Sequence, residues 1–223
     1  MGLIHSPKIP SKGLVHAYDV GNPRCKPEGA NSVLDLVGDK NAQIDNGAFV
    51  SPEFGGCIKC DDTEDAVEWD GGSSDEINLG TGPQTVSVWY YQYNPSEGYV
   101  IVFGSTLTTY QYHLAIAPSN TIIRVGTGQA KYFGSLGGSI TGEKWQNVTY
   151  TRDGTYYRIY VDGVQKTATD TTLTADTTIG RMNGGTYHRQ SDYGCVHMYN
   201  RVLSATEVKQ LYDAMKGRYN RGD

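Results

Sequence analysis

Short apolar runs separated by turn-forming residues constrain the fold of this chain more than any other feature. The runs are divided by Gly, Asn, Asp or Pro and lie at 42–45, 57–60, 66–69, 84–93, 99–104, 110–116, 121–126, 144–151, 155–161 and 193–199. Runs of this kind are typical of strands in two antiparallel sheets packed face to face. A chain of 223 residues suffices for one such domain. We predict an all-β fold, a two-sheet antiparallel β-sandwich of the jelly-roll kind with one C-terminal helix.

The run at 84–93 has the clearest alternation, because Val86, Val88 and Tyr90 share one face of an extended strand. We predict that this face points into the core. Two Asp-Gly pairs, at 153–154 and 162–163, separate strand-like runs and are strong hairpin signals. Together they predict a three-stranded meander.

The C-terminal part carries the one helix that the sequence predicts. Ser204 and Glu207 have the spacing of a capping box, in which each side chain binds the backbone N–H of the other. We expect a helix over about 204–216, lying on the sandwich as a cover. The predicted domain organisation is an N-terminal arm at 1–12, the sandwich at 13–217 and a polar tail at 218–223.

Charge and composition exclude several classes of partner. The net charge is −5 and the pI about 5.5, so no basic field attracts a phosphate backbone, and nucleic acid is not expected as a partner. No stretch approaches the roughly 18 apolar residues of a membrane span, and the first residues lack the apolar core of a signal peptide. We therefore expect synthesis without Sec export, with Cys25, Cys57, Cys60 and Cys195 as reduced thiols.

Catalytic chemistry is not predicted. A glycosidase on this fold needs two carboxyl groups flanking the scissile bond. The acidic cluster comprises Asp61, Asp62, Glu64, Asp65 and Glu68, and reads as a turn rather than as a strand that aligns two carboxylates. We predict no catalytic residue, no metal site and no cofactor, although hard oxygen ligands of this kind leave calcium open.

Two segments in the C-terminal half carry a family resemblance. Residues 144–154 read Lys-Trp-Gln-Asn-Val-Thr-Tyr-Thr-Arg-Asp-Gly, and residues 158–163 read Arg-Ile-Tyr-Val-Asp-Gly. They resemble the signature W-x-x-V-x-x-x-R-D-G … Y-V-D-G of laminin-G-like, or concanavalin A-like, jelly rolls. The segment 196–204 is similar to the closing strand and helix start of that family.

The N-terminal half resembles a narrower branch of the family, found as standalone domains in bacteriophage virion proteins. Its members open with Ser-Pro-Lys, Gly-Leu-Val and Asp-x-x-Asn-Pro, which stand here at 6–8, 13–15 and 19–23. The resemblance implies a non-enzymatic virion structural protein, either a capsid surface decoration or a fibre or tail appendage. The resemblance places such a protein on the virion surface, with a major capsid or tail protein as its partner. It is also compatible with a homo-oligomer.

An anchoring arm follows from this hypothesis. The arm mixes apolar Leu3, Ile4 and Ile9 with Pro7, which removes a backbone donor. Such a segment is too short to bury a core of its own. We therefore expect residues 1–12 to attach the domain to a particle.

Two other functions stay open. One is a carbohydrate-binding module for host or environmental polysaccharide. In that hypothesis Trp89, Tyr91 and Tyr93 project from the face opposite to the core and stack on sugar rings. The other is a glycoside hydrolase.

Overall fold

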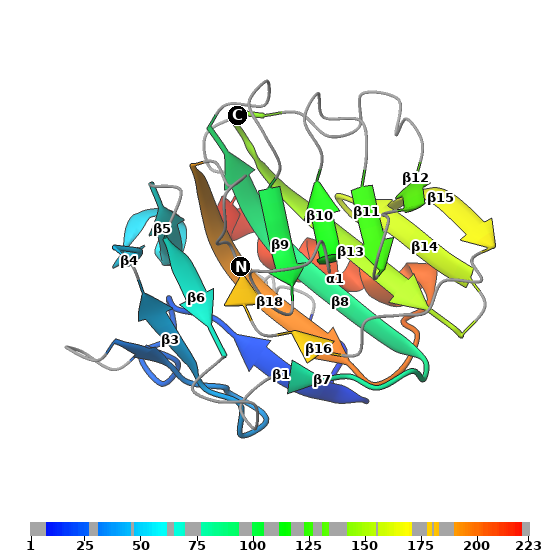
Figure 1. The fold of residues 1–223 in the computed structure, drawn as a ribbon, viewed down its shortest axis with the longest axis horizontal. Coiled ribbons are helices and arrows are strands. Elements are labelled where there is room, and N and C mark those ends of the chain that lie inside the picture. Colours follow the sequence, from blue (N-terminus) through cyan, green and yellow to red (C-terminus); the bar gives the residue numbers. More distant parts are fainter. Residues whose placement is uncertain are drawn as a thin grey trace, which may run out of the picture.

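Two antiparallel sheets make up most of the molecule (Figure 1). The computed structural model describes residues 8–26, 31–45, 47–61, 65–69, 77–93, 100–104, 112–116, 123–126, 131–133, 142–154, 156–170, 178–179, 181–182 and 190–219. In Figure 1 the only labelled helix, α1, lies behind one sheet, on the side away from β9, β10 and β11 of the other. The all-β prediction with one C-terminal helix is confirmed.

The sheet that carries the helix, called the helix-bearing sheet below, has the order β15-β14-β13-β8-β18-β5-β4, with β1 also paired to β18. Its strands are β1 (Leu14–Tyr18), β4 (Phe49–Ser51), β5 (Cys57–Cys60), β8 (Gln84–Gln92), β13 (Trp145–Arg152), β14 (Tyr156–Val161), β15 (Val164–Asp170) and β18 (Ser191–Tyr199). A short 3-10 helix, η1 (Glu53–Gly55), joins β4 to β5.

The other sheet, called the facing sheet, has the order β12-β11-β10-β9-β17-β6-β3-β2. Its strands are β2 (Ser32–Val33), β3 (Ala42–Asp45), β6 (Ala66–Glu68), β9 (Val100–Gly104), β10 (Tyr112–Ile116), β11 (Ile123–Gly126), β12 (Lys131–Phe133) and β17 (Arg181–Met182). A separate pair joins β7 (Ile77–Asn78) to β16 (Thr178–Ile179).

The main core lies between the two sheets. Val86, Val88 and Tyr90 of β8 are fully buried in it, together with Val33 and Val67 from the facing sheet. The face of β8 predicted to be apolar is therefore the interior face, as the alternation indicated. Burial of several such side chains supplies the main driving force for closing the sandwich.

The predicted meander is present as β13, β14 and β15, which are neighbours in the sheet. Asp162 and Gly163 at the second turn have φ values of 51° and 74°. Two successive residues with positive φ are the backbone conformation of two-residue hairpin turns, whose twist matches that of the strands. The Asp162 carboxylate also accepts the Asn147 N–H at 2.9 Å, which fastens the turn to β13.

Helix α1 (Ala205–Tyr219) begins at the predicted capping box. The Glu207 N–H donates to the Ser204 hydroxyl oxygen at 3.2 Å, and the Ser204 N–H donates to Glu207 Oε2 at 2.9 Å. Arg201 adds a two-pronged contact, with Nη2 2.6 Å from Oε1 and Nη1 3.0 Å from Oε2 of Glu207. Hydrogen bonds from Arg201 and Ser204 hold the pKa of Glu207 at about 2. The N-terminus of α1 is therefore fixed by side chains on both sides of the cap.

The far end of α1 corrects the predicted boundaries. The helix runs to Tyr219 rather than to about 216, so Arg218 and Tyr219 do not belong to a polar tail. Tyr219 is 2% exposed, and its hydroxyl accepts the Cys195 N–H at 2.8 Å. Tertiary contacts of this kind keep the last turn helical past Gly217.

Arg218 connects this last turn to two distant parts of the chain. Its guanidinium donates to Asp19 Oδ1 at 2.7 Å, to the Phe54 carbonyl at 2.9 Å and to the Gly56 carbonyl at 2.7 Å. A planar guanidinium offers donors in a fixed fork, which suits three acceptors converging from two segments. Arg218 thus fastens α1 to the turn after β1 and to η1.

The predicted arm is part of the fold from residue 8 onward. Ile9 is half-buried against the cluster of Tyr160, Tyr199, Leu203, Val208 and Leu211 under α1. Gln210 donates from its amide to the Lys8 carbonyl. Ile9 is therefore engaged inside the domain rather than free as an anchor, because α1 offers it an apolar surface. Leu3, Ile4 and Pro7 lie outside the described residues.

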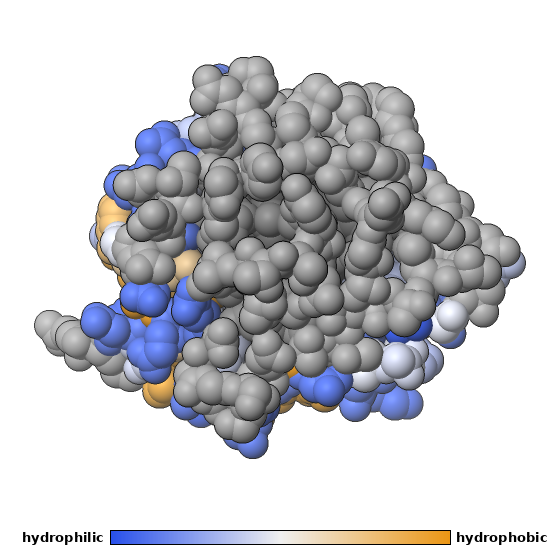
Figure 2. Space-filling view, viewed as in Figure 1, coloured by the Kyte–Doolittle hydropathy of each residue, from blue (hydrophilic) through white to orange (hydrophobic). Residues whose placement is uncertain are grey.

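In the view of Figure 2 the described residues along the lower and left margins are mostly hydrophilic, with small hydrophobic patches between them. Within the part of the chain that the structure describes, no helix is long and apolar enough to cross a membrane.

Replacing Arg218 tests this account of helix docking. Arg218→Ala removes the guanidinium donor from the Asp19 carboxylate and from two carbonyl groups, so we expect a loss of about 2–4 kcal/mol in the free energy of unfolding by urea. Arg218→Lys keeps the charge without the fork and should lose less. Lys216→Ala, in the same helical turn but solvent-exposed, is the control and should leave the urea midpoint unchanged. Equal stability of Arg218→Ala and the wild type would contradict the assignment.

Candidate functional site

A row of aromatic rings runs along the outer face of the helix-bearing sheet, the face opposite to the core. Successive ring centroids are 5.5 Å apart for Tyr212 and Trp89, 4.7 Å for Trp89 and Tyr219, 4.7 Å for Tyr219 and Trp145, 6.0 Å for Trp145 and Tyr91, and 4.8 Å for Tyr91 and Tyr93. Tyr212 and Tyr219 belong to α1, Trp89 and Trp145 lie beneath the helix, and Tyr91 and Tyr93 lie beyond its C-terminal end.

The position of Trp89 corrects the predicted glycan site. Trp89 faces outward from the sheet as expected, but it is only 1% exposed because Tyr212 and Tyr219 of α1 stack on it. A ring sandwiched between the sheet and the helix cannot stack on a sugar. Trp89 is therefore a helix-docking residue, and the candidate site excludes it.

Tyr91 and Tyr93 lie at the uncovered end of the row. Tyr91 is half-buried and Tyr93 is 37% exposed. Their rings meet edge to face with an interplanar angle of 62°. This arrangement leaves part of both rings open to solvent, as the prediction for these two residues requires.

The pairing of neighbouring strands places further side chains beside Tyr91 on the same face of the sheet. Along one line of paired positions Phe49 of β4 lies opposite Lys59, Lys59 lies opposite Asp192, and Asp192 lies opposite Tyr91. Ile58 and Tyr193 point into the core, so their strand neighbours Lys59 and Asp192 point outward. We call the surface formed by Phe49, Glu53, Lys59, Tyr91, Tyr93 and Asp192 the outer patch.

Asp192 is the most unusual group of the outer patch. Its side chain is almost fully buried, with the residue 2% exposed, and its Oδ2 accepts the Tyr93 hydroxyl hydrogen bond at 2.8 Å. The buried Oδ1 has no hydrogen-bond partner among the described residues. Burial raises the pKa of Asp192 to about 6, against the lowering effect of the Tyr93 bond and of Lys59.

Lys59 supplies the positive charge of the outer patch. Its ammonium lies 2.7 Å from Oε2 of Glu53, a carboxylate that is 57% exposed. This contact raises the pKa of Lys59, with smaller contributions from Asp192 and Tyr93. The outer patch therefore combines the exposed rings of Phe49 and Tyr93 with the Lys59–Glu53 ion pair and the buried carboxylate of Asp192.

Sequence reasoning finds Tyr91 and Tyr93 but misses Phe49, Lys59 and Asp192. Phe49 belongs to a strand of three residues, too short for a visible alternation. Asp192 does alternate with the core residue Tyr193, which is the one signal in the sequence that a carboxylate points outward from this strand.

The other groups singled out from the sequence are structural where the structure describes them. Asp65 is buried, and its carboxylate accepts the Asp61 N–H at 2.8 Å, which closes a loop. Asp62 and Glu64 lie outside the described residues. Within the described ranges no three His, Cys, Asp or Glu residues gather as metal ligands.

The four cysteines are free and buried. Cys57 lies in the cluster under α1 and Cys60 in the main core, so the two side chains point to opposite faces of β5. Cys195 and His197 lie beneath α1. Burial raises the pKa of Cys195 to about 12 and lowers the pKa of His197 to about 4, so both are neutral at pH 7.

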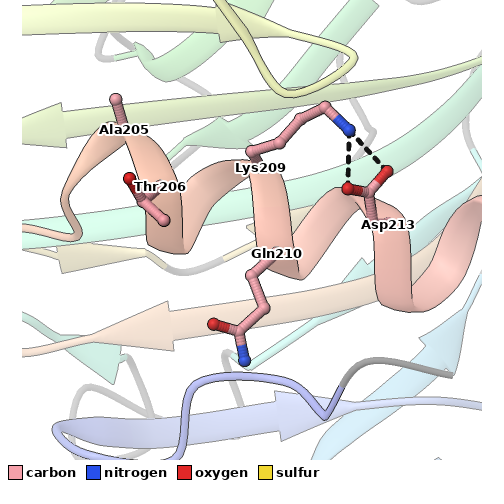
Figure 3. Close-up of a pocket in the computed structure, with 5 residues that line it drawn as sticks. All are labelled: Ala205, Thr206, Lys209, Gln210 and Asp213. Carbon is pink, nitrogen blue, oxygen red and sulfur yellow. Dashed lines mark hydrogen bonds and ion pairs between the residues drawn. The ribbon is translucent and has the colours of Figure 1, made fainter. Parts of the chain in front are cut away.

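A shallow hollow on the solvent side of α1 is a second candidate surface (Figure 3). It is lined by Ala205, Thr206, Lys209, Gln210 and Asp213. Figure 3 shows Lys209 paired with Asp213 along the helix, at 2.6 Å, and the Gln210 amide is already bound to Lys8. The polar groups of this hollow are engaged with the protein itself, so it ranks below the outer patch.

The sandwich with its outer helix and an exposed aromatic patch is the architecture of a lectin-like domain. The family model of the concanavalin A-like lectin/glucanases superfamily matches residues 61–209, more than half of the chain. The chain therefore belongs to this superfamily, as the laminin-G-like motifs indicated. No curated protein sequence matches it.

Solved structures extend the likeness to nearly the whole chain. A sialidase of Trypanosoma rangeli in complex with sialic acid is 16% identical with a TM-score of 0.70, and the match covers 95% of this chain and 34% of the sialidase. The binding domain of botulinum neurotoxin serotype D is 15% identical with a TM-score of 0.64, and the match covers 90% of this chain and 51% of that domain. The chain thus spans about a third of the sialidase and half of the toxin domain, and at these identities the likeness shows the fold alone.

These findings correct the predicted function. The similar structures are sialidases and a neurotoxin binding domain, and they give no support to a bacteriophage virion structural protein. That prediction is wrong. It rested on short N-terminal motifs, Ser-Pro-Lys at 6–8, Gly-Leu-Val at 13–15 and Asp-x-x-Asn-Pro at 19–23, and motifs of this kind do not determine the function of a domain. The expected virion surface, capsid or tail partner and anchoring role lose their basis with it.

The raised pKa of Asp192 makes a stability prediction. A carboxyl whose pKa rises from 3.8 to about 6 on folding adds stability below pH 3.8, and this contribution disappears as the pH rises through 6. Asp192→Asn keeps an acceptor for Tyr93 without the charge. It should therefore gain up to about 3 kcal/mol in the free energy of unfolding at pH 8, and nothing at pH 4.

Urea unfolding at both pH values measures this difference. Asp61→Asn, an exposed neighbour of the outer patch, is the matched control and should change stability little at either pH. A loss of stability in Asp192→Asn at pH 8 would mean that Lys59 outweighs the burial of the charge.

Proposed function

We propose that this domain is a non-catalytic, lectin-like module that binds a neutral carbohydrate on the outer patch. The observation that carries the proposal is the pair of exposed aromatic rings, Phe49 and Tyr93, set on one face of a rigid sheet with polar groups between them. Aromatic faces combined with a few fixed polar groups are the usual means of binding a sugar ring at a protein surface.

Exposure of the rings supports this choice of surface. Among the described residues, five large hydrophobic side chains are exposed: Val37 (50%), Phe49 (46%), Tyr93 (37%), Tyr156 (41%) and Val164 (53%). Phe49 and Tyr93 belong to the same face, three strands apart, so strand spacing sets them roughly 15 Å from each other. A span of this length suits a chain of sugar units rather than one monosaccharide.

Charge favours a neutral ligand. Around Asp192 the charged groups are Lys59 on the positive side and Glu53 and Asp61 on the negative side, and the exposed pair Glu143 and Lys144 beside the end of β8 adds no net charge. Lys59 is already paired with Glu53, so an acidic sugar would meet a net negative field. Because the similar sialidase structure contains sialic acid, acidic sugars form the competing class in the test below.

The carboxylates of the outer patch do not suit hydrolysis. A glycosidase needs two carboxyl groups that reach either side of the scissile bond. The Oδ1 atom of Asp192 is buried and its Oδ2 is bound to Tyr93, while Glu53 is paired with Lys59. These contacts favour binding without catalysis.

Alanine variants test the proposed surface. Retention of the domain on gels or columns containing mannan, galactan, dextran or laminarin is measured against alginate and polysialic acid. We expect binding to at least one neutral polysaccharide, and at least a tenfold loss of affinity in Tyr93→Ala and Phe49→Ala, since aromatic anchors dominate such surfaces.

Tyr156→Ala is the matched control, because Tyr156 is a similarly exposed tyrosine of the same sheet. It lies at the start of β14, at the end of the sheet opposite to Tyr93. This variant should bind like the wild type. Preferential binding of the acidic polymers, or full binding by Tyr93→Ala, would contradict the proposal.

A further inference from the structure

We infer that Asp192 is the positioning residue of the outer patch, which holds Tyr93 in its ligand-binding orientation through their hydrogen bond and makes binding depend on pH. The inference rests on the proposed function, because it explains how the same surface is prepared for a sugar. Asp192 acts through Tyr93 and does not touch the ligand itself.

Tyr93 and Asp192 differ in their exposure to solvent. Tyr93 directly follows β8 and is 37% exposed, whereas Asp192 is buried on β18. The hydroxyl of Tyr93 donates to Asp192 Oδ2 at 2.8 Å, so one end of an otherwise exposed ring is fixed by a buried acceptor. Tyr91 holds the ring from the side, with its centroid 4.8 Å away. The ring is therefore set in place before a ligand arrives.

A fixed ring has a direct effect on affinity. Ordering an exposed side chain on binding has an entropic cost, and a side chain that is already ordered avoids it. A hydrogen bond to a charged carboxylate is roughly twice as strong as one to a neutral group. Ionised Asp192 should therefore hold Tyr93 better than protonated Asp192.

Several titratable groups of the surrounding elements interact electrostatically with Asp192. They are Lys59 and Cys57 of β5, Glu53 of η1, Asp61 after β5, Tyr93 after β8 and Tyr193 of β18. Lys59 is the only cation in this set and favours the ionised form, while burial together with Glu53 and Asp61 opposes it. This balance puts the change of charge near pH 6.

Stability gives a second reason to assign a role to this carboxylate. Its ionised form costs stability near neutral pH, and an asparagine would fill the same place in the sheet without that cost. Residues that lower the stability of the fold are expected at ligand-binding surfaces, because selection for binding there can outweigh selection for stability.

The first arm of the test needs no ligand. Tyrosine labelled with carbon-13 at Cζ is introduced, and the Tyr93 signal is identified by its loss in Tyr93→Phe. Between pH 4.5 and 8 the signal should shift with a midpoint near 6 in the wild type and stay constant in Asp192→Asn. A Tyr93 signal that does not respond to pH would overturn the inference.

The second arm measures affinity for mannan, galactan, dextran and laminarin at pH 7.5 and pH 5. Wild-type binding should weaken about three- to tenfold at pH 5. Asp192→Asn and Tyr93→Phe should bind at that weaker level at both pH values, although Asp192→Asn is the more stable protein at pH 7.5. Tyr156→Phe loses an exposed hydroxyl elsewhere on the sheet and should keep the wild-type pH profile.

The two arms separate the failure of each proposal. Binding that is equal at both pH values while the Tyr93 signal titrates would overturn the positioning role and leave the proposed function intact. If no polysaccharide binds at either pH, the proposed function fails, and the tyrosine titration alone decides whether Asp192 holds Tyr93.

Discussion

The docking of the last turn of α1 onto the helix-bearing sheet is the contact on which the rest of the outer surface depends. Tyr219 inserts between Trp89 and Trp145, with centroid distances of 4.7 Å to both, while Arg218 binds Asp19 and the carbonyls of Phe54 and Gly56. These contacts tie together the turn after β1, the β4–β5 connection and the C-terminal helix. A sandwich sheet needs cover only where its outer face is apolar, and α1 supplies that cover over the aromatic row.

The end of the helix consequently divides the aromatic row into two functional parts. Trp89 and Trp145 are covered and contribute to stability, since large aromatic side chains bury the most apolar area. Tyr91 and Tyr93 continue the same row past the helix and remain accessible. A rigid, close-packed base beneath accessible rings favours ligand binding, because the side chains lose little conformational entropy when the ligand binds.

The sequence was sufficient for the fold and for only part of the site. The alternation of Val86, Val88 and Tyr90, the Asp-Gly turns and the capping box all describe local structure, and each predicted element was found. The same alternation placed Trp89 on the outer face correctly, but burial under α1 is a tertiary property that no strand pattern contains. Asp192 and Phe49 join Tyr93 only through the pairing of β4, β5, β18 and β8, segments far apart in the chain. Function was the weakest inference, because the motifs that define the family are motifs of its architecture.

The most direct test of the central claim is to map a bound glycan on the domain. Backbone amide signals, recorded by NMR while an oligosaccharide of the preferred neutral polysaccharide is added, report which strands the ligand touches. The account predicts shifts at Phe49, Lys59 and Tyr93, with Trp89 and the residues under α1 unaffected. Shifts confined to β9, β10 and β11 of the facing sheet would show that the ligand binds on the opposite side of the sandwich, and would contradict the account.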